Sequence, residues 1–253
     1  MYLFRKIILW MIPLTWIVGL ELMKEYQQWW WLIVLLILLQ QIATIFFVCK
    51  FKFNKNLVHF LILPLIFSLA SWLFLVFIVE AWFFHVVVIL SGLVLYFLIY
   101  QYYLYFYIPF RYQPYSLESM SLYISLLSAF FLFSSGFGGL ILLQLNVWLL
   151  SLVLFLAMSL ITYQYFWINK FDVIKNWLFV LVIVLSLVEI FVAVSFLPTG
   201  YYVNGFALAV AFYVMLGLSK HYLSETFNRK RIYSFLVVGG LCLLLVLFSA
   251  QWG

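Results

Sequence analysis

Long apolar runs, separated by short polar or charged segments, occupy nearly the whole 253-residue chain. A run of about 20 apolar residues is what an α-helix needs to cross a hydrocarbon core about 30 Å thick. Dividing the chain at charged residues and at Pro, Gly, Asn and Asp therefore predicts a bundle of about nine transmembrane helices. The predicted spans are about 7–23, 29–49, 58–79, 82–107, 120–143, 147–168, 177–198, 200–219 and 233–252.

Composition favours an all-α integral membrane protein in which residues 1–253 form a single transmembrane helical domain. Hydrophobic residues make up 69% of the chain and charged residues 8%, whereas soluble domains contain about 45–50% apolar and about 25% charged residues. Spans and tight connections leave no room for a soluble domain. The N-terminal run begins with basic residues, as a signal peptide does, but no small-residue cleavage site follows, so we expect it to be the first span.

Basic residues lie at alternate ends of the predicted spans, and this alternation predicts the orientation of the chain. Because Lys and Arg near span ends are retained on the cytoplasmic side, we expect a multi-pass protein of a bacterial plasma (inner) membrane with its N-terminus in the cytoplasm and its C-terminus outside. The net charge of +6 then faces anionic lipid, and no nucleic-acid partner is expected. Of the 13 basic residues only Lys24 falls on the outer side. The others are Arg5, Lys6, Lys50, Lys52, Lys55, Arg111, Lys170, Lys175, Lys220, Arg229, Lys230 and Arg231.

Two pairs of short segments indicate a parallel internal repeat. KFKFNKN at 50–56 and KFDVIKN at 170–176 share the pattern K-F-x-x-x-K-N, and each follows an even-numbered span. LSGLVLYFLIY at 90–100 also aligns with VNGFALAVAFY at 203–213. An even number of spans between the copies predicts a 4+4+1 arrangement, in contrast to the inverted repeats of many transporters. Chance matches between lysine-rich loops are the alternative.

One carboxyl group lies deep in a predicted span. Glu189 is about 18 Å along the helix from Trp177, at 1.5 Å per residue, which places it near the midplane. Every Lys and Arg lies at a span end, so an ionised carboxylate at this depth would cost several kcal/mol without a partner. We therefore expect Glu189 to be protonated. The candidate hydrogen-bond partners are Gln40, Gln41, Ser186, Ser195 and serines of the fifth span.

Other polar residues flank two of the predicted outer turns. Glu80 and His85 lie around the turn between the third and fourth spans, and Tyr202 and Asn204 follow the Pro-Thr-Gly break between the seventh and eighth. If the bundle brings these turns together, they form the mouth of an outward-facing pocket with Glu189 at its floor. The alternative is that Glu189 is a neutral residue whose hydrogen bond joins two helices.

Small residues form a run in the fifth span, SSGFGG from Ser134 to Gly139. Because small side chains let helix backbones approach closely, this run predicts a tight helix crossing. A hinge or a pore lining is the alternative.

Enzyme motifs and metal-ligand clusters are missing from the sequence. No P-loop, H-E-x-x-H, G-x-S-x-G or D-D-x-x-D motif occurs, and the two cysteines and three histidines are scattered. We therefore expect no metal and no cofactor. Catalysis stays open only as acid–base chemistry by Glu189 with His85.

A segment that follows the membrane glutamate resembles other proteins. The run FLPTGYYVNGFALAVAFYVMLGL is similar to a segment of uncharacterised polytopic membrane proteins from bacteria with reduced genomes. The resemblance covers about forty residues, and it implies a membrane setting without an activity.

Three functions fit these observations. The first is transport or binding of a small or lipid-like ligand through an outward-facing cavity, with Glu189 as the protonatable group and Glu80, His85, Tyr202 and Asn204 at the mouth. The second is a scaffold or assembly subunit that holds another membrane protein of a cell-envelope complex. The third is an intramembrane lipid-modifying enzyme.

Overall fold

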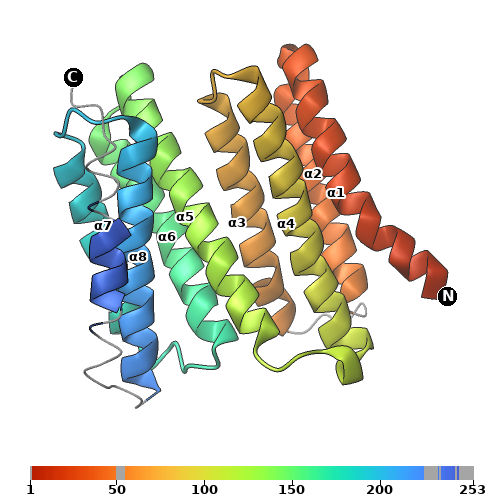
Figure 1. The fold of residues 1–253 in the computed structure, drawn as a ribbon. Helices are drawn as coiled ribbons and strands as arrows, with labels where there is room; N and C mark the ends of the chain where they lie inside the picture. The colour runs from red at the N-terminus through yellow and green to blue at the C-terminus, as the bar shows by residue number, and fades with distance from the viewer. Residues whose placement is uncertain (1, 50–54, 225–232, 234, 243, 245–253) are drawn as a thin grey trace. The chain divides into compact units, whose positions relative to one another are not determined.

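The computed structural model describes residues 2–49, 55–224, 233, 235–242 and 244. The described chain is all-helical (Figure 1), which confirms the predicted fold class. Its α-helices are α1 (Tyr2–Glu25), α2 (Trp30–Val48), α3 (Lys55–Val76), α4 (Ala81–Tyr107), α5 (Ser116–Leu142), α6 (Val147–Ile168), α7 (Trp177–Val194) and α8 (Tyr201–Leu223). Short 3-10 turns, Gln27–Trp29 and Pro109–Arg111, precede α2 and follow α4.

Seven of the described helices, α2 to α8, are long and apolar enough to cross a membrane. The chain is therefore an integral, multi-pass membrane protein whose helices lie in a lipid bilayer. The second to eighth predicted spans coincide with these helices, and the first lies within α1. The ninth, 233–252, falls partly outside the described residues, of which 233, 235–242 and 244 are helical.

The chain divides into two compact units, residues 1–124 and residues 125–253. The division falls within α5, so the first unit contains α1 to α4 and the second contains most of α5 together with α6 to α8. The predicted 4+4+1 repeat stays a prediction.

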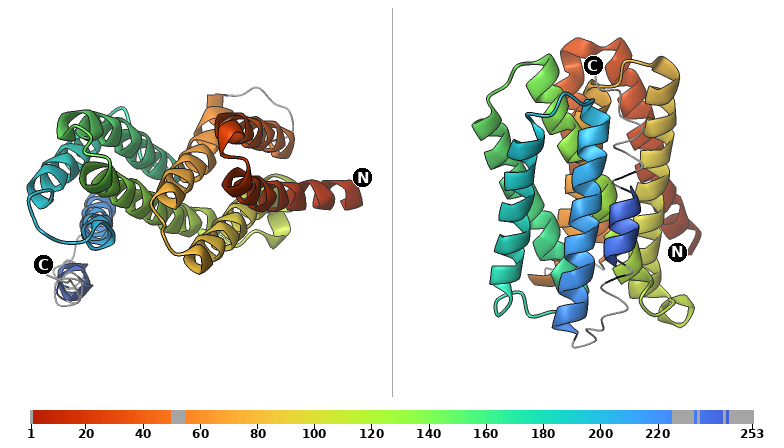
Figure 2. Two further views of the ribbon diagram at one scale, coloured as in Figure 1. Left: turned by 90° about the horizontal axis from the view of Figure 1, so that it is seen from above. Right: turned by 60° about the vertical axis from the view of Figure 1, so that its left-hand side comes forward.

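The first unit is a bundle in which α1 packs on α2 and α4, and α3 packs on the same two helices (Figure 2). Its core contains Phe67, Leu95 and Tyr102, which are fully buried. A hydrogen bond also crosses the core, because the indole Nε1 of Trp16 in α1 donates to Oγ of Ser91 in α4 at 2.8 Å. In a membrane such bonds add to the packing of apolar side chains, which lipid alone does not drive.

Close backbone approach holds the second unit together. The run 131–139 of α5 is buried throughout, and a Cβ added at Gly205 of α8 would lie 2.7 Å from the backbone N of Ser134. The ring of Phe137 lies 4.6 Å from that of Phe191 in α7, centroid to centroid. The small residues of α5 thus form a tight helix crossing, and that prediction is confirmed.

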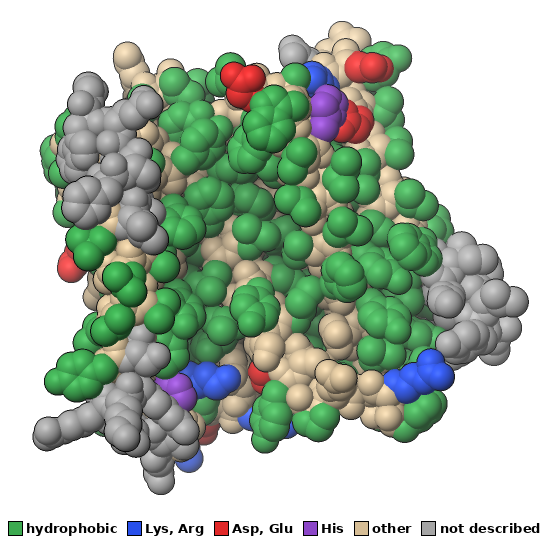
Figure 3. All heavy atoms as spheres, in the orientation of Figure 1, with side chains coloured by type: hydrophobic (Ala, Val, Ile, Leu, Met, Phe, Trp, Pro, Cys, Tyr) green, Lys and Arg blue, Asp and Glu red, His purple; other side chains and the backbone are tan. Residues whose placement is uncertain are grey.

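Apolar side chains cover the sides of the helices, and charged side chains gather near the helix ends (Figure 3). On α6, for example, Leu149, Leu152, Val153 and Leu156 are all exposed. Such a surface is compatible with lipid and not with water. The orientation of the termini stays a prediction.

Candidate functional site

Glu189 lies on the face of α7 that points away from the core of the second unit. The buried residues of α7 are Ile183, Val184, Leu187 and Phe191. At about 100° per residue these four share one face of the helix, and position 189 falls on the opposite face. Glu189 is correspondingly exposed.

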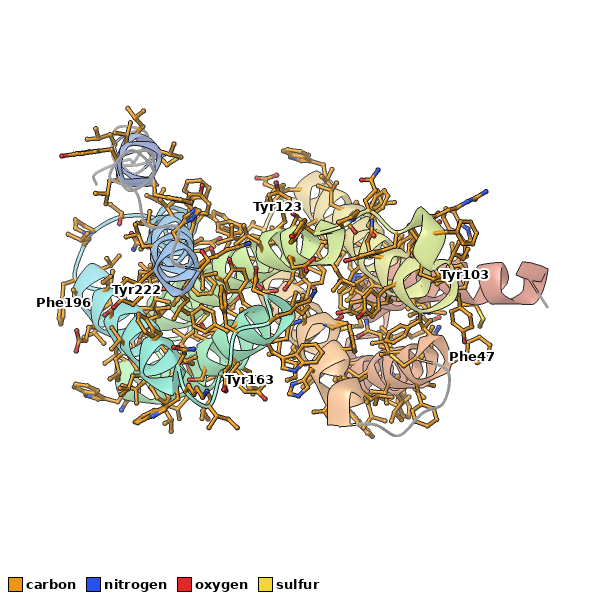
Figure 4. The ribbon with its side chains drawn as sticks, turned by 90° about the horizontal axis from the view of Figure 1, so that it is seen from below. Phe47, Tyr103, Tyr123, Tyr163, Phe196 and Tyr222 are labelled. Atoms are coloured by element: carbon orange, nitrogen blue, oxygen red, sulfur yellow. The ribbon has the colours of Figure 1, made fainter. Side chains whose placement is uncertain are left out.

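The exposed residues around Glu189 form a stripe, which we call the α7 stripe. Figure 4 shows Phe196, just beyond the end of α7, at the rim of the second unit on the side turned away from its other helices. Phe196 is 83% exposed. The stripe consists of Leu178, Val182, Leu185, Glu189 and Ala193 of α7, with Phe196 just beyond the helix. Apart from Glu189 the stripe is apolar, so the carboxyl is the one polar group on this face.

No side chain among the described residues forms a hydrogen bond or an ion pair with the Glu189 carboxyl. Two of its predicted partners are engaged elsewhere: Ser195 Oγ donates to the carbonyl of Val192 at 2.7 Å, and Gln41 contacts Ser68. A polar group on the lipid side of a helix cannot find water to replace a missing partner. Among the residues that the structure describes, the Glu189 carboxyl therefore has no side-chain hydrogen-bond partner.

Asn204 closes the turn between α7 and α8. Its side-chain oxygen accepts a hydrogen bond from the Thr199 hydroxyl, and its Nδ2 donates to the Thr199 carbonyl at 3.4 Å. Both residues are buried. Tyr202 is half-buried in the first turn of α8, and its ring is tilted against that of Tyr201, with 4.1 Å between the centroids. The amide of Asn204 thus binds its own turn.

His85 contacts a carboxylate that the sequence did not single out. Its Nδ1 lies 2.7 Å from Oε1 of Glu21, at the end of α1. Lys24 lies nearby, 5.4 Å from the centre of the Phe84 ring. Glu80 is exposed at the N-terminus of α4 and makes no capping hydrogen bond with its side chain. The orientation predicted from the basic residues places Glu21 and His85 at the same membrane face, and this signal in the sequence could have indicated that the two residues lie close together.

The two glutamines join helices of the first unit. Gln41 is buried, and its amide both donates to and accepts from Ser68 Oγ, at 2.8 and 3.0 Å. Gln40 Nε2 donates to the Met11 carbonyl of α1 at 3.4 Å. Gln41 of α2 and Ser68 of α3 therefore join two helices by buried hydrogen bonds, the role predicted as the alternative for Glu189.

A groove of about 350 Å³ lies between α1 and α2 on the outside of the first unit. Its polar lining is limited to Thr15, whose hydroxyl bonds to its own helix, and Gln40. The apolar lining comes from Leu14, Val18, Gly19, Leu22, Ile33, Leu36 and Ile37. An apolar chain fits this lining, and a polar solute does not.

The predicted site residues fall into separate groups. Glu80, His85, Gln40 and Gln41 belong to the first unit, whereas Glu189, Tyr202 and Asn204 belong to the second. A pocket that joins them stays a prediction. Within the described ranges, no group of three or more His, Cys, Asp or Glu side chains could hold a metal ion.

Comparison with known proteins identifies the family but no activity. A family model described as a protein of unknown function (DUF5656) matches residues 10–249, and the chain therefore belongs to this family. No curated protein matches the chain. No solved structure matches it either. The match says nothing about bacteria with reduced genomes, so that resemblance stays a prediction.

Proposed function

We propose that this member of the DUF5656 family is an assembly subunit that binds another membrane-spanning helix through the α7 stripe. The exposure of Glu189, in the middle of an apolar helix face, is the observation that carries the proposal. Ionisable residues within transmembrane segments almost always face protein or a water-filled cavity, because lipid offers no hydrogen bonds. A helix from a partner would supply the missing hydrogen bond.

Transport through a cavity with Glu189 at its floor is a weaker explanation of the same residue. Proton-coupled transport needs the carboxyl to face water at some stage of the cycle. On α7 the buried side chains, such as Leu187 and Phe191, face the core, and Glu189 faces away from it. The acid–base chemistry considered for Glu189 with His85 has the same difficulty, and it requires a contact between residues of the two units.

In-membrane photocrosslinking tests the proposed function. A photoreactive amino acid replaces Leu185 of the α7 stripe or, as the matched control, Leu156 of α6, which are 42% and 57% exposed. We expect a protein crosslink from position 185 only, and we expect Glu189→Leu to reduce its yield. Crosslinks to lipid alone from both positions would overturn the proposal.

A second candidate function, binding of a lipid-like ligand, is supported by the groove between α1 and α2. Its volume of about 350 Å³ and its apolar lining fit an acyl or isoprenoid chain. Val18→Trp would fill the groove, and Leu35→Trp, at an exposed position of α2 outside the groove lining, is the control. Mass spectrometry of the lipids that copurify with each protein should show a lipid species that is present with the wild type and with Leu35→Trp and absent with Val18→Trp.

A further inference from the structure

We propose that the partner of the α7 stripe is a second copy of this chain, with α7 packed against α7 about a two-fold axis along the membrane normal. This inference rests on the proposed function and names the partner. Three features support a second copy as the partner: the chemistry of the Glu189 carboxyl, the spacing of the residues in the stripe, and the positions of Lys and Arg in the chain.

A protonated carboxyl complements another copy of itself. It offers one O–H donor and a carbonyl acceptor, so two such groups satisfy each other without any further side chain. Every copy of a membrane protein inserts in the same direction, because the same basic loops set its orientation. A two-fold axis along the membrane normal therefore places residue 189 of one copy opposite residue 189 of the other, at the same depth.

The spacing of the stripe is that of a parallel helix pair. Leu178, Val182, Leu185 and Glu189 follow one another along α7 at intervals of four, three and four residues, and α7 ends at Val194. This alternation is the 3.5-residue period with which two helices keep a continuous seam in contact. A single polar residue in such a seam fixes its register, because any shift separates the two polar groups.

In a homodimer, the positions of the basic residues favour a second carboxyl, and not a cation, as the group that pairs with Glu189. In the sequence every Lys and Arg lies outside or at the end of the apolar spans, so a second copy brings no cation to the depth of Glu189. Two ionised carboxylates would repel each other at this depth. The pairing therefore requires at least one of the two carboxyls to be protonated, and it requires no other residue.

Cysteine crosslinking in native membranes tests this pairing on the full chain. Both native cysteines are first removed by Cys49→Ala and Cys242→Ala. A single cysteine is then introduced at Val182 or at Leu185 of the stripe, and the control carries it at Leu156 of α6. Copper phenanthroline should join two copies through the first two positions and not through the control.

Two variants of Glu189 separate hydrogen bonding from simple contact. Glu189→Gln keeps one donor group and one acceptor on the same side chain, so the crosslinked dimer should persist. Glu189→Leu removes both, and the dimer yield at limiting protein density should fall about three- to thirty-fold, as expected for one or two interhelical hydrogen bonds in lipid. Thermal unfolding in detergent confirms that both variants are folded.

The outcomes also separate this inference from the proposed function. A photocrosslink from position 185 to a different polypeptide, without a disulfide-linked dimer, would overturn the second copy and leave the assembly function in place. A dimer whose yield is the same in Glu189→Leu would overturn the pairing of the carboxyls. If positions 182 and 185 give no more dimer than position 156 and no protein photocrosslink, both proposals are wrong.

Discussion

Nδ1 of His85 lies 2.7 Å from Oε1 of Glu21, and this contact joins the end of α1 to the beginning of α4. The two side chains are 45% and 36% exposed, so water at the membrane surface screens their interaction. The contact therefore holds the ends of two packed helices in place and adds little to their stability.

Replacing either partner should have a small and non-additive effect. We expect Glu21→Gln and His85→Gln each to lower the free energy of unfolding by at most about 1 kcal/mol, with a coupling of about 0.2–1 kcal/mol in the double variant. Unfolding in detergent, followed by circular dichroism, measures the cycle. Glu80→Gln is the control, and an equal loss of stability there would show that charge at this face, not the Glu21 contact, is what matters.

Gly205 should be intolerant of a side chain. A Cβ at this position would meet the backbone N and Cα of Ser134 at 2.7 and 2.8 Å, and a backbone cannot move aside as a side chain can. We expect Gly205→Ala to destabilise the second unit by about 1–3 kcal/mol or more.

Gly200 provides the matched control for Gly205. Nothing lies within 4 Å of an added Cβ at Gly200, and its φ of −64° suits any residue. Gly200→Ala should therefore cost less than about 1 kcal/mol, chiefly as a poorer helix N-cap. Thermal unfolding of the two variants compares them, and equal costs would contradict the close packing of α8 on α5.

The pair of Gln41 and Ser68 should behave as a buried unit. Ser68→Ala leaves a buried amide without its partner, so we expect a loss of about 1–2 kcal/mol. Adding Gln41→Leu removes the orphaned amide and should restore much of the lost stability, because an apolar pair needs no hydrogen bond. A double-mutant cycle by thermal unfolding tests this, and additive losses would show that the two side chains act independently.

The predicted orientation can be tested at two exposed apolar positions, so that no charge is altered. Val79, between α3 and α4, and Ile174, between α6 and α7, are 85% and 87% exposed. In a chain without its own cysteines, a membrane-impermeant thiol reagent added to intact cells should label Val79→Cys and leave Ile174→Cys unlabelled. Permeabilised cells, in which both should react, are the control, and the reverse pattern in intact cells would mean the opposite orientation.

Most of the fold follows from the order of residues along the chain. The predicted spans 82–107 and 147–168 agree with α4 and α6 to within one residue, because charged and Asn residues are costly in the hydrocarbon region and so gather near helix ends. The run SSGFGG likewise predicted a close crossing, since only small residues allow it. These features depend on the local sequence alone.

The candidate site follows from the sequence only in part. Depth along α7 identified Glu189, and span ends identified His85, but neither reveals what a side chain contacts. Asn204 binds Thr199 and His85 contacts Glu21, contacts that arise from a local turn and from the packing of α1 on α4.

The sequence by itself determined that the chain crosses a membrane many times, approximately where its helices lie, and which carboxyl lies deep within them. The cost of placing polar backbone and charge in lipid acts residue by residue, and it is therefore visible in the order of residues. Only the tertiary structure decided that Glu189 points away from the core of its unit. In a helix that is apolar all round, sequence periodicity does not distinguish the face that meets protein from the face that meets lipid, and packing against α5, α6 and α8 makes that choice.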